Sequence, residues 1–417
     1  MAVDLRQVMA AVLTFSMFIM LGNMIKRDHI DPLLEPLPAS SGVHYDVLKV
    51  SKPGMVKLTE ITYGPWQEQN EAAKPCWKKP SFKEKQQSNG YIFFSLTHGP
   101  EFHASQIANA VMVARYLGAT LALPDIKLGS KLEEKRRFGE IYDADKFMAS
   151  LKGVVRVDKN PPDDLSNGRL PIVKIPDRVS EDFIPSNIKP IFHSKRNLKI
   201  VTYFNSSAMA KGKTDKLSNP YQCLAMFESL QLQGELQEVV DSMVGTLRSL
   251  SKKMSGRFVA VDLRVDKLGE KGCQESDSAK KCYNAEEIGE FLKKIGFHKD
   301  TTVYLTQTGW HTSLNAVRNV FPNTFTKDAI MPADEKAKFM DVENHAYEKF
   351  IDYYMCTQGD AFIPAFPSKF YEGVVGERIG LGKTQIFVPV RNTSAAANEY
   401  ISPYIAKKSH FAHSCFC

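Results

Sequence analysis

A short apolar segment that ends in charged residues is the first place where this sequence could do chemistry. Phe258 to Leu263 is typical of a buried strand in a parallel sheet, because such strands are covered on both faces. Arg264 follows it, between Asp262 and Asp266. Ligands of open α/β sheets bind beyond the carboxyl ends of the strands, and an arginine fork fits a phosphate. The pattern predicts either a phosphate-binding arginine or a cluster of surface salt bridges.

A loop that contains glycine and histidine is the second candidate. Ser95 to Gln106 is typical of a strand end, a turn at Gly99 and the start of a helix. Such a turn presents backbone N–H groups to an anion or a sugar. His98, Glu101 and His103 carry side chains that could act as acids, bases or hydrogen-bond donors. The alternative is an ordinary strand-to-helix loop whose polar residues cap the helix.

The third candidate begins at Asp360. A predicted strand runs from there into a loop and then into a helix that reaches Arg378. Ser368 and Lys369 are expected near the N-terminus of that helix, which is a favourable place for a phosphate. The alternative is a capped helix without a ligand, and the pattern alone favours it.

Two shorter motifs have simpler explanations than binding. Asp143-Ala144-Asp145 has the Asp-x-Asp form that holds a divalent metal in some sugar transferases, but it precedes an apolar helix pattern and favours helix capping. Gly380 to Lys383 resembles a phosphate loop without its spacing, and a turn explains it. No Cys-x-x-Cys occurs, so no zinc site is expected. We predict neither a metal nor a cofactor.

The elements that position these residues alternate between strand and helix patterns, which predicts an α/β fold with parallel sheets. Two half-chains of similar pattern meet near residue 235. They predict two Rossmann-like domains, 89–235 and 236–417, that face a cleft. Strands are expected at Tyr91–Leu96, Thr120–Leu123, Val154–Val157, Ile200–Phe204, Phe258–Leu263, Thr302–Leu305, Ala361–Ala365 and Gln385–Val388. Helices are expected at His103–Leu117, at Gln222–Lys253 with a break near Gly234, from a capping box at Asn284 to Gly296, at Leu314–Val320 and at Glu343–Tyr354.

Composition limits the class of protein. The chain has 417 residues, 43% hydrophobic and 24% charged, which is typical of globular proteins of about two domains. The net charge of +7 is spread along the chain, and its densest cluster, Lys131 to Arg137, is mixed in sign. A solvated face explains that cluster better than a nucleic-acid site does, so no nucleic-acid partner is predicted.

An uncharged segment near the N-terminus predicts a membrane anchor. Val8 to Ile25 carries no charge and would span roughly 27 Å as a helix, enough for a thin bilayer. A cleaved signal peptide is the alternative, but no small-x-small cleavage site follows. The sequence therefore predicts a cytosolic tail at 1–7, a transmembrane signal anchor at 8–25, a stem at 26–88 and a luminal body. Trp66 and Trp77 indicate that part of the stem packs on this body.

Two other features, the glycosylation sequons and the cysteines, are consistent with a luminal body. Asn205 and Asn392 begin N-glycosylation sequons, which are used only there. All seven cysteines follow the predicted anchor, in a compartment that permits disulfides. Cys273 and Cys282 bracket a polar loop and are the preferred disulfide candidates. Cys415 and Cys417 are too close to pair with each other.

Several of these segments, taken together and in order, resemble the plant branch of the O-fucosyltransferase-like glycosyltransferases. The matching segments are Asn89-Gly90-Tyr91, the Gln106 helix with Val111–Arg115, Leu117–Leu121, Asp262-Leu263-Arg264 and Asp360–Pro364. Within that family the chain is most similar to the mannan synthesis-related proteins. The segments that carry this likeness are Val3–Gln7, Lys74–Trp77, Phe258–Arg264, Ile330–Ala333, Ile401–Ile405 and Ser414–Cys417.

The resemblance implies a GT-B fold, a single-pass type II anchor in the Golgi membrane and metal-independent transfer from a nucleotide sugar, with a GDP-sugar favoured. It implies a mannan or glucomannan acceptor and work beside mannan synthase. Arg264 would bind the donor's diphosphate, and Asp262 stands where many relatives have histidine. Gly99, Gln106, Asp360, Ser368 and Lys369 would border the nucleotide sugar. The wider family often has Gly-Gly-x-Asn-Gln before its first long helix, and here only Ser105-Gln106 matches.

Three functions follow as hypotheses. The leading one is a glycosyltransferase of mannan biosynthesis, in which Arg264 stabilises the departing diphosphate and Glu101 or His103 deprotonates the acceptor. The second is a non-catalytic partner that supports mannan synthase through binding. The third is a sulfotransferase, which would need a phosphate loop near the first strand, and none is evident.

Overall fold

The computed structural model describes residues 64–66, 71–78, 87–128, 134–162, 165, 169–204, 219–268, 282–340, 347–390 and 394–417. Residues Glu60–Cys417 belong to one compact unit. The predicted membrane span, most of the predicted stem and the sequons at Asn205 and Asn392 lie outside the described residues. Within the described ranges, no helix is both long and apolar enough to cross a membrane.

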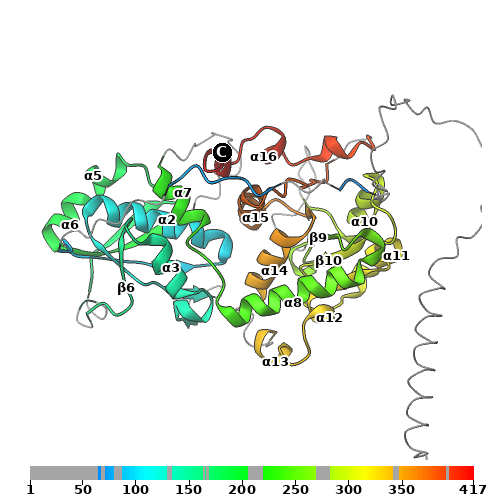
Figure 1. The fold of residues 1–417 in the computed structure, drawn as a ribbon, viewed down its shortest axis with the longest axis horizontal. Coiled ribbons are helices and arrows are strands. Elements are labelled where there is room, and N and C mark those ends of the chain that lie inside the picture. The colour runs from blue at the N-terminus through cyan, green and yellow to red at the C-terminus, as the bar shows by residue number, and fades with distance from the viewer. Residues whose placement is uncertain are drawn as a thin grey trace, which may run out of the picture. The chain divides into compact units, whose positions relative to one another are not determined.

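The first half of the unit is built on a five-stranded parallel sheet (Figure 1). Its order is β6-β3-β1-β8-β7, with β1 at Tyr91–Phe93, β3 at Thr120–Ala122, β6 at Arg156–Asp158, β7 at Ile172–Pro176 and β8 at Asn197–Tyr203. The predicted strand Tyr91–Leu96 is divided at Phe94. Its second part, β2 (Ser95–Thr97), joins a separate small sheet with β4 (Asp125–Leu128) and β5 (Glu134–Arg136).

The second half is built on a four-stranded parallel sheet of order β11-β10-β9-β12. Its strands are β9 at Phe258–Asp262, β10 at Thr302–Leu305, β11 at Thr324–Thr326 and β12 at Ala361–Pro364. Every residue of β9, β10 and β12 is buried, which explains their continuous apolar sequences. The predicted strand Gln385–Val388 makes only single bridges, from Ile386 to Phe362 and from Phe387 to Ile401. The predicted α/β fold with parallel sheets is confirmed.

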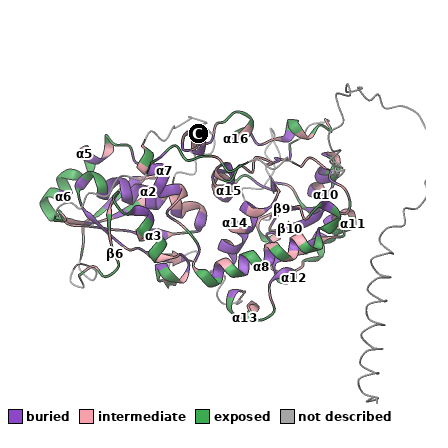
Figure 2. Cartoon of the chain, viewed as in Figure 1, coloured by how far each residue is buried: buried purple, intermediate pink, exposed green. Residues whose placement is uncertain are grey.

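The helices pack on these sheets (Figures 1 and 2), and α14 and α15 of the second half contact α2 of the first half. The predicted capping box forms, because Asn284 and Glu287 exchange hydrogen bonds at the start of α10. The longer helices are α2 (Pro100–Leu117), α3 (Ala144–Leu151), α7 (Pro220–Phe227), α8 (Gly234–Leu250), α10 (Ala285–Lys294), α14 (Glu348–Gln358) and α15 (Lys369–Gly380). The shorter helices are α5 (Phe183–Asn187), α6 (Lys189–Lys195), α9 (Val265–Leu268), α11 (Asn315–Val320), α12 (Lys327–Ile330), α13 (Lys336–Phe339) and α16 (Pro403–Ala406).

Helix α15 joins the two halves because glycines let its neighbours approach closely. A Cβ atom on Gly373 would lie 3.0 Å from the Cβ of Glu101 on α2. A Cβ atom on Gly376 would lie 2.9 Å from the His410 ring. The same helix carries Arg378, whose fully buried guanidinium donates to the carbonyls of Cys356 at 3.1 Å and Gln385 at 3.1 Å, among others. The glycines and the arginine thus fix α15 against α2, α14 and β12.

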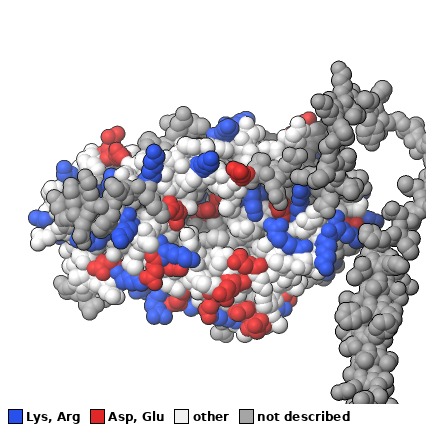
Figure 3. Space-filling model, in the orientation of Figure 1, with Lys and Arg blue, Asp and Glu red and all other residues white. Residues whose placement is uncertain are grey.

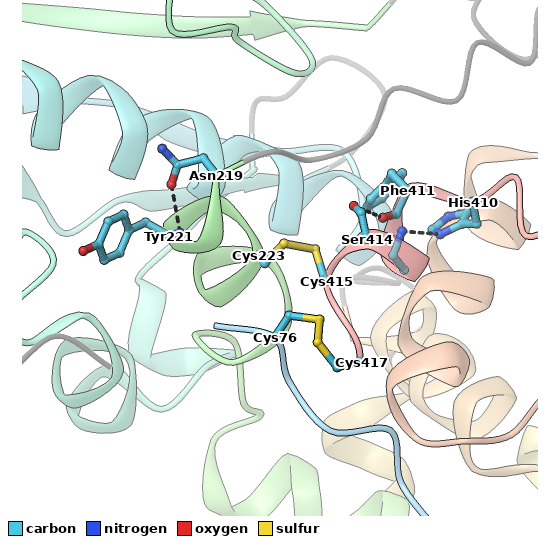
Figure 4. Close-up of a disulfide and its surroundings, with 10 residues drawn as sticks. Cys76, Asn219, Tyr221, Cys223, His410, Phe411, Ser414, Cys415 and Cys417 are labelled. Carbon is cyan, nitrogen blue, oxygen red and sulfur yellow. Dashed lines mark hydrogen bonds between the residues drawn. A yellow bond between two sulfur atoms is a disulfide. The ribbon is translucent and has the colours of Figure 1, made fainter. Parts of the chain in front are cut away.

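The C-terminal tail returns to the first half of the chain and is bound there by two disulfides (Figure 4). Cys415 is bonded to Cys223 on α7, and Cys417 is bonded to Cys76. Trp77 lies beside this clamp, 8% exposed, and donates to a Glu228 carboxylate oxygen at 2.8 Å. The prediction that this part of the stem packs on the body is confirmed for Trp77. Cys415 and Cys417 indeed do not pair with each other.

The predicted pairing of Cys273 with Cys282 involves a residue outside the described ranges. Cys282 itself is disulfide-bonded. Cys356 is free and buried on α14. The surface, in the view of Figure 3, mixes Lys and Arg with Asp and Glu.

Replacing Cys223 and Cys415 together by serine is expected to lower the free energy of unfolding by about 2–5 kcal/mol. The bond joins residues 192 positions apart and therefore restricts a long stretch of the unfolded chain. Denaturant unfolding without reductant measures the loss. Cys356→Ala is the control, because it removes a buried thiol without removing a bond. A loss no larger than that of the control would contradict the role of the clamp.

Candidate functional site

Arg264 lies at the carboxyl edge of the four-stranded sheet, two residues after the end of β9. Its side chain is 20% exposed, although its Nε is buried. The guanidinium carbon lies 5.3 Å from the ring centroid of Phe366 and 5.5 Å from that of Phe370. Both rings belong to the segment that follows β12, the neighbouring strand. The fork is thus packed between the ends of two strands and held for planar recognition of an anion.

Asp262 lies behind this arginine and has no exposed surface. Its Oδ1 is 3.3 Å from Arg264 Nε, an ion pair without hydrogen-bond geometry, and accepts a hydrogen bond from Thr306 Oγ1 at 3.0 Å. Its Oδ2 has no hydrogen-bond partner among the described residues. Burial raises the pKa of Asp262 to about 6, although Arg264 and Thr306 act in the opposite direction. Asp262 therefore touches the arginine and not the solvent.

A second buried ion-pair group supports the same edge. Lys327, the first residue of α12, has no exposed surface and contacts Asp352 Oδ2 at 2.6 Å and Glu348 Oε2 at 3.7 Å. Tyr304 of β10 donates to the other oxygen of Asp352 at 2.6 Å. Burial raises the pKa of Asp352 against the opposing effect of Lys327. These contacts connect α14 to the strands that end beside Arg264.

The N-terminus of α2 approaches this region from the first half of the chain. Gly99 precedes the helix without a side-chain cap, and Pro100 is its first residue. The Glu101 side chain is 3% exposed and paired with Lys349 of α14. A Cβ atom on Gly99 would lie 2.5 Å from Lys349 Nζ, so glycine is needed there for the lysine to reach Glu101. Glu101 and Gly99 thus lie where the two halves meet.

Two predicted site residues of α2 are directed elsewhere. His103 has no exposed surface, and its Nδ1 lies 2.9 Å from the Tyr142 hydroxyl. Burial lowers the pKa of His103 to about 3, so it is neutral and enclosed. Gln106 receives the Thr97 backbone N–H at 3.0 Å and donates to the Thr97 hydroxyl at 2.6 Å. The predicted role of His103 as a base disagrees with its complete burial. The predicted contact of Gln106 with a ligand disagrees with its two hydrogen bonds to Thr97.

The three residues predicted around α15 have different positions. Ser368 is the N-cap and accepts from the Tyr371 N–H at 3.0 Å, which agrees with the capped-helix alternative. Lys369 is paired with Glu372 at 2.7 Å and remains partly exposed at the carboxyl edge. Asp360 instead precedes β12 and accepts from the Phe258 N–H at 3.0 Å. Because Phe258 begins β9, Asp360 lies about 13 Å from the Arg264 edge, and its predicted contact with the nucleotide disagrees with the fold.

The two shorter motifs agree with their simpler explanations. Asp143 caps α3 by accepting from the Asp145 and Lys146 N–H groups at 3.1 and 2.9 Å. Gly380 to Lys383 ends α15, and Lys383 donates to the Gln358 carbonyl at 2.7 Å. The contacts of Asp143 and of Gly380 to Lys383 are thus contacts at helix ends.

A small cavity lies between α2, α7, α14 and α15. It is lined by Glu101, Lys369, Glu372, Glu377 and Tyr353, among others, and its volume is about 50 Å³. That is room for one or two water molecules and far below the volume of a bound cofactor or sugar nucleotide. Burial raises the pKa of Glu377 to about 7. The cavity lies in the region where the two halves meet.

The profile of the family described as GDP-fucose protein O-fucosyltransferase matches residues 91–380, which include both sheets, α2 and Arg264. The chain belongs to this family. The resemblance predicted from the sequence motifs is therefore confirmed.

Full-length relatives of this O-fucosyltransferase-like chain carry names from mannan synthesis. Protein MANNAN SYNTHESIS-RELATED 2 of Arabidopsis thaliana is 48% identical over 424 residues, and Protein MANNAN SYNTHESIS-RELATED of Trigonella foenum-graecum is 44% identical over 420 residues. Each alignment covers 100% of both chains. Among solved structures, fucosyltransferase NodZ from Bradyrhizobium is similar at 16% identity, with a TM-score of 0.40, over 74% of this chain and 97% of that chain.

Several residues around the O-fucosyltransferase-like site were missed from the sequence. Thr306, Phe366 and Phe370 surround the Asp262–Arg264 pair, and Lys349 holds Glu101. Thr306 could have been found, because it follows the predicted strand Thr302–Leu305 and parallel strands end at one edge. Lys349 carries no such signal, since its partner lies 248 residues away.

Proposed function

We propose that this chain is a glycosyltransferase of mannan or glucomannan biosynthesis that transfers a sugar from a nucleotide-sugar donor, with a GDP-sugar favoured. Two findings support the proposal: the chain belongs to the O-fucosyltransferase family, and its full-length relatives are named for mannan synthesis. The observation that carries it is Arg264, a partly exposed arginine held between two aromatic rings at the carboxyl edge of a parallel sheet.

The residues around Arg264 support a metal-independent reaction of the GT-B type. Arg264 would bind the donor's diphosphate and stabilise its charge as the bond to the anomeric carbon breaks. Phe366 and Phe370 hold the fork so that little reorganisation is needed when this charge develops. Glu101 is the proposed base for the acceptor hydroxyl, because it lies where the two halves meet and its Oε2, although buried, has no hydrogen-bond partner among the described residues. Proton transfer to that oxygen completes the substitution.

The test is transfer by the purified full chain, using a panel of GDP- and UDP-sugars with mannan and glucomannan oligosaccharides. We expect a new glycosidic product with at least one GDP-sugar, and a large loss of product with Glu101→Gln. If no donor in the panel gives a product, the catalytic part of the proposal is wrong.

A non-catalytic partner of mannan synthase is the second candidate. The 50 Å³ cavity between the halves and the engagement of Gln106 by Thr97 favour it. Complementation separates the two candidates: Arg264→Ala is introduced into plant cells that lack this chain, and their mannan is measured. Restored mannan favours the partner function, whereas mannan that stays low favours catalysis.

The proposed location is the Golgi membrane, with the segment at 8–25 as a single-pass type II anchor and the body in the lumen. The two disulfides of the C-terminal tail support an oxidising compartment. Protease protection of the body in intact Golgi vesicles, lost on adding detergent, is the expected result. Digestion of the body in intact vesicles would contradict this orientation.

A further inference from the structure

The pair of Asp262 and Arg264 raises a question about charge that the proposed function leaves open. A diphosphate needs a positive partner, yet the arginine that would receive it already faces a carboxylate at 3.3 Å. The carboxylate cannot swing into solvent, because it has no exposed surface and is held by Thr306. An arriving diphosphate would thus bring negative charge close to a buried negative charge.

We propose that Asp262 is a positioning residue for Arg264 that takes up one proton when the diphosphate of a nucleotide sugar binds. The inference rests on the proposed function. In the empty site, the carboxylate holds the guanidinium. In the occupied site, Asp262 Oδ2 carries a proton, Arg264 stays charged, and the diphosphate becomes its counter-ion. No bond other than the O–H bond on Asp262 forms, and the proton comes from the solvent.

The geometry provides a place for this proton. Asp262 Oδ1 is occupied by Thr306 and the arginine, whereas Oδ2 is buried and without a hydrogen-bond partner among the described residues. A protonated Oδ2 would leave the contacts of Oδ1 in place. Burial already raises the pKa of Asp262 to about 6, close to the range in which ligand charge can change its protonation at neutral pH.

The nearby acids add to the effect of burial on the pKa of Asp262, and Arg264 opposes it. Asp352 on α14 and Glu101 on α2 both raise the pKa of Asp262, and Arg264 is the cation that lowers it. Lys327 of α12 is held by Asp352, and Lys349 is held by Glu101. Thr306 of β10 adds a hydrogen bond but no charge, and Cys356 of α14 is a buried thiol that stays protonated because burial raises its pKa. Asp266, the remaining acid that acts on Arg264, is exposed and therefore screened.

The sign of the pH dependence follows from these positions. Ligand charge favours the protonated form of Asp262, so the pKa of Asp262 is higher with the ligand than without it. Binding is therefore strongest below about pH 6, where the free site is already protonated. Affinity falls as the pH rises above 6, by up to about tenfold per pH unit for one proton. It levels off once the pH exceeds the pKa of the occupied site.

The experiment is titration calorimetry of the full chain with GDP-fucose, whose diphosphate diester does not titrate between pH 5 and 8. Measurements at pH 7 in two buffers of different ionisation heat give the number of protons taken up. We expect up to one proton for the wild type, none for Asp262→Asn, and weaker pH dependence of Kd in that variant. Asp266→Asn is the matched control, because it removes one carboxylate near Arg264 and should leave proton uptake unchanged.

Thr306→Val provides a second variant that keeps both members of the pair. It removes the hydrogen bond that stabilises the Asp262 carboxylate, so the fall in affinity should move to higher pH. Binding of GDP-fucose without proton uptake, or equal uptake by Asp262→Asn, overturns this inference and leaves the proposed function standing. Absence of binding by the wild type at every pH, for GDP-fucose and GDP-mannose alike, overturns the donor-binding function itself.

Discussion

Arg264→Ala is expected to weaken binding of a GDP-sugar by about 100-fold or more and to abolish transfer. The alanine removes the charge that would face the diphosphate and leaves the buried Asp262 carboxylate without its cation. Truncating one member of a hydrogen-bonded charge pair between partners, here Arg264 and the diphosphate, costs about 2–5 kcal/mol in binding. The affinity of Arg264→Lys should lie between those of the wild type and Arg264→Ala. An ammonium keeps the charge but loses the planar fork held by Phe366 and Phe370. Calorimetric titration measures the change in Kd.

Arg248→Ala is the matched control for this prediction. Arg248 pairs with Asp360 at 3.5 Å, at the opposite end of β9 from Arg264. Its loss removes one arginine from the same half of the molecule without touching the carboxyl edge. A Kd that changes equally in both variants would contradict the assignment of the diphosphate to Arg264.

Lys327→Met is expected to have the largest effect on stability, lowering the free energy of unfolding by about 3–5 kcal/mol. The lysine has no exposed surface, and its ammonium lies between two largely buried carboxylates. Its removal takes away the ammonium that contacts the Asp352 carboxylate at 2.6 Å. In the variant, Lys327 no longer opposes the effect of burial, so the folded-state pKa of Asp352 lies above its unfolded-state value. Folding therefore gains from protonation of Asp352 at low pH and loses that gain as the pH rises. The loss should therefore be smaller at pH 5 than at pH 8.

Lys336→Met is the matched control for stability. Lys336 pairs with Asp328 at 3.0 Å, but the two side chains are 39% and 54% exposed. Exposed pairs of this kind contribute about 0–1 kcal/mol. Denaturant unfolding of both variants, at both pH values, measures the difference. Equal losses of unfolding free energy in the two variants would contradict the view that burial makes the Lys327 ion pairs stabilising.

The strand before Arg264 could be predicted from the sequence because two local signals agree. Every residue from Phe258 to Asp262 is buried, as the apolar run indicates, and the charges follow where a parallel strand ends. Chain direction alone then places Arg264 at the edge where ligands of α/β sheets bind. The same rule could have excluded Asp360, which comes before its strand.

Other site residues were misjudged because their partners come from distant parts of the chain. His103 is enclosed by Tyr142, 39 residues away, and by the ring of Phe350. Gln106 looks free in sequence, but its amide completes the turn at Thr97. The position of Ser368 was easier to predict, since a serine directly before a helix pattern is typical of an N-cap residue. Polar residues on buried helix faces thus cannot be assigned to a ligand until the opposing surface is known.

The C-terminal clamp has a consequence for how the protein is made. Both bonds use the last three residues, and the cysteine partnered with Cys417 lies 341 positions earlier. Neither bond can form until Cys415 and Cys417 have left the ribosome, which happens long after Cys76 and Cys223 have been made. The segment around Trp77 and helix α7 can therefore be linked covalently only after a much later part of the chain has been synthesised. A stop codon at position 415 would therefore leave residues 1–414 intact but without either of these bonds.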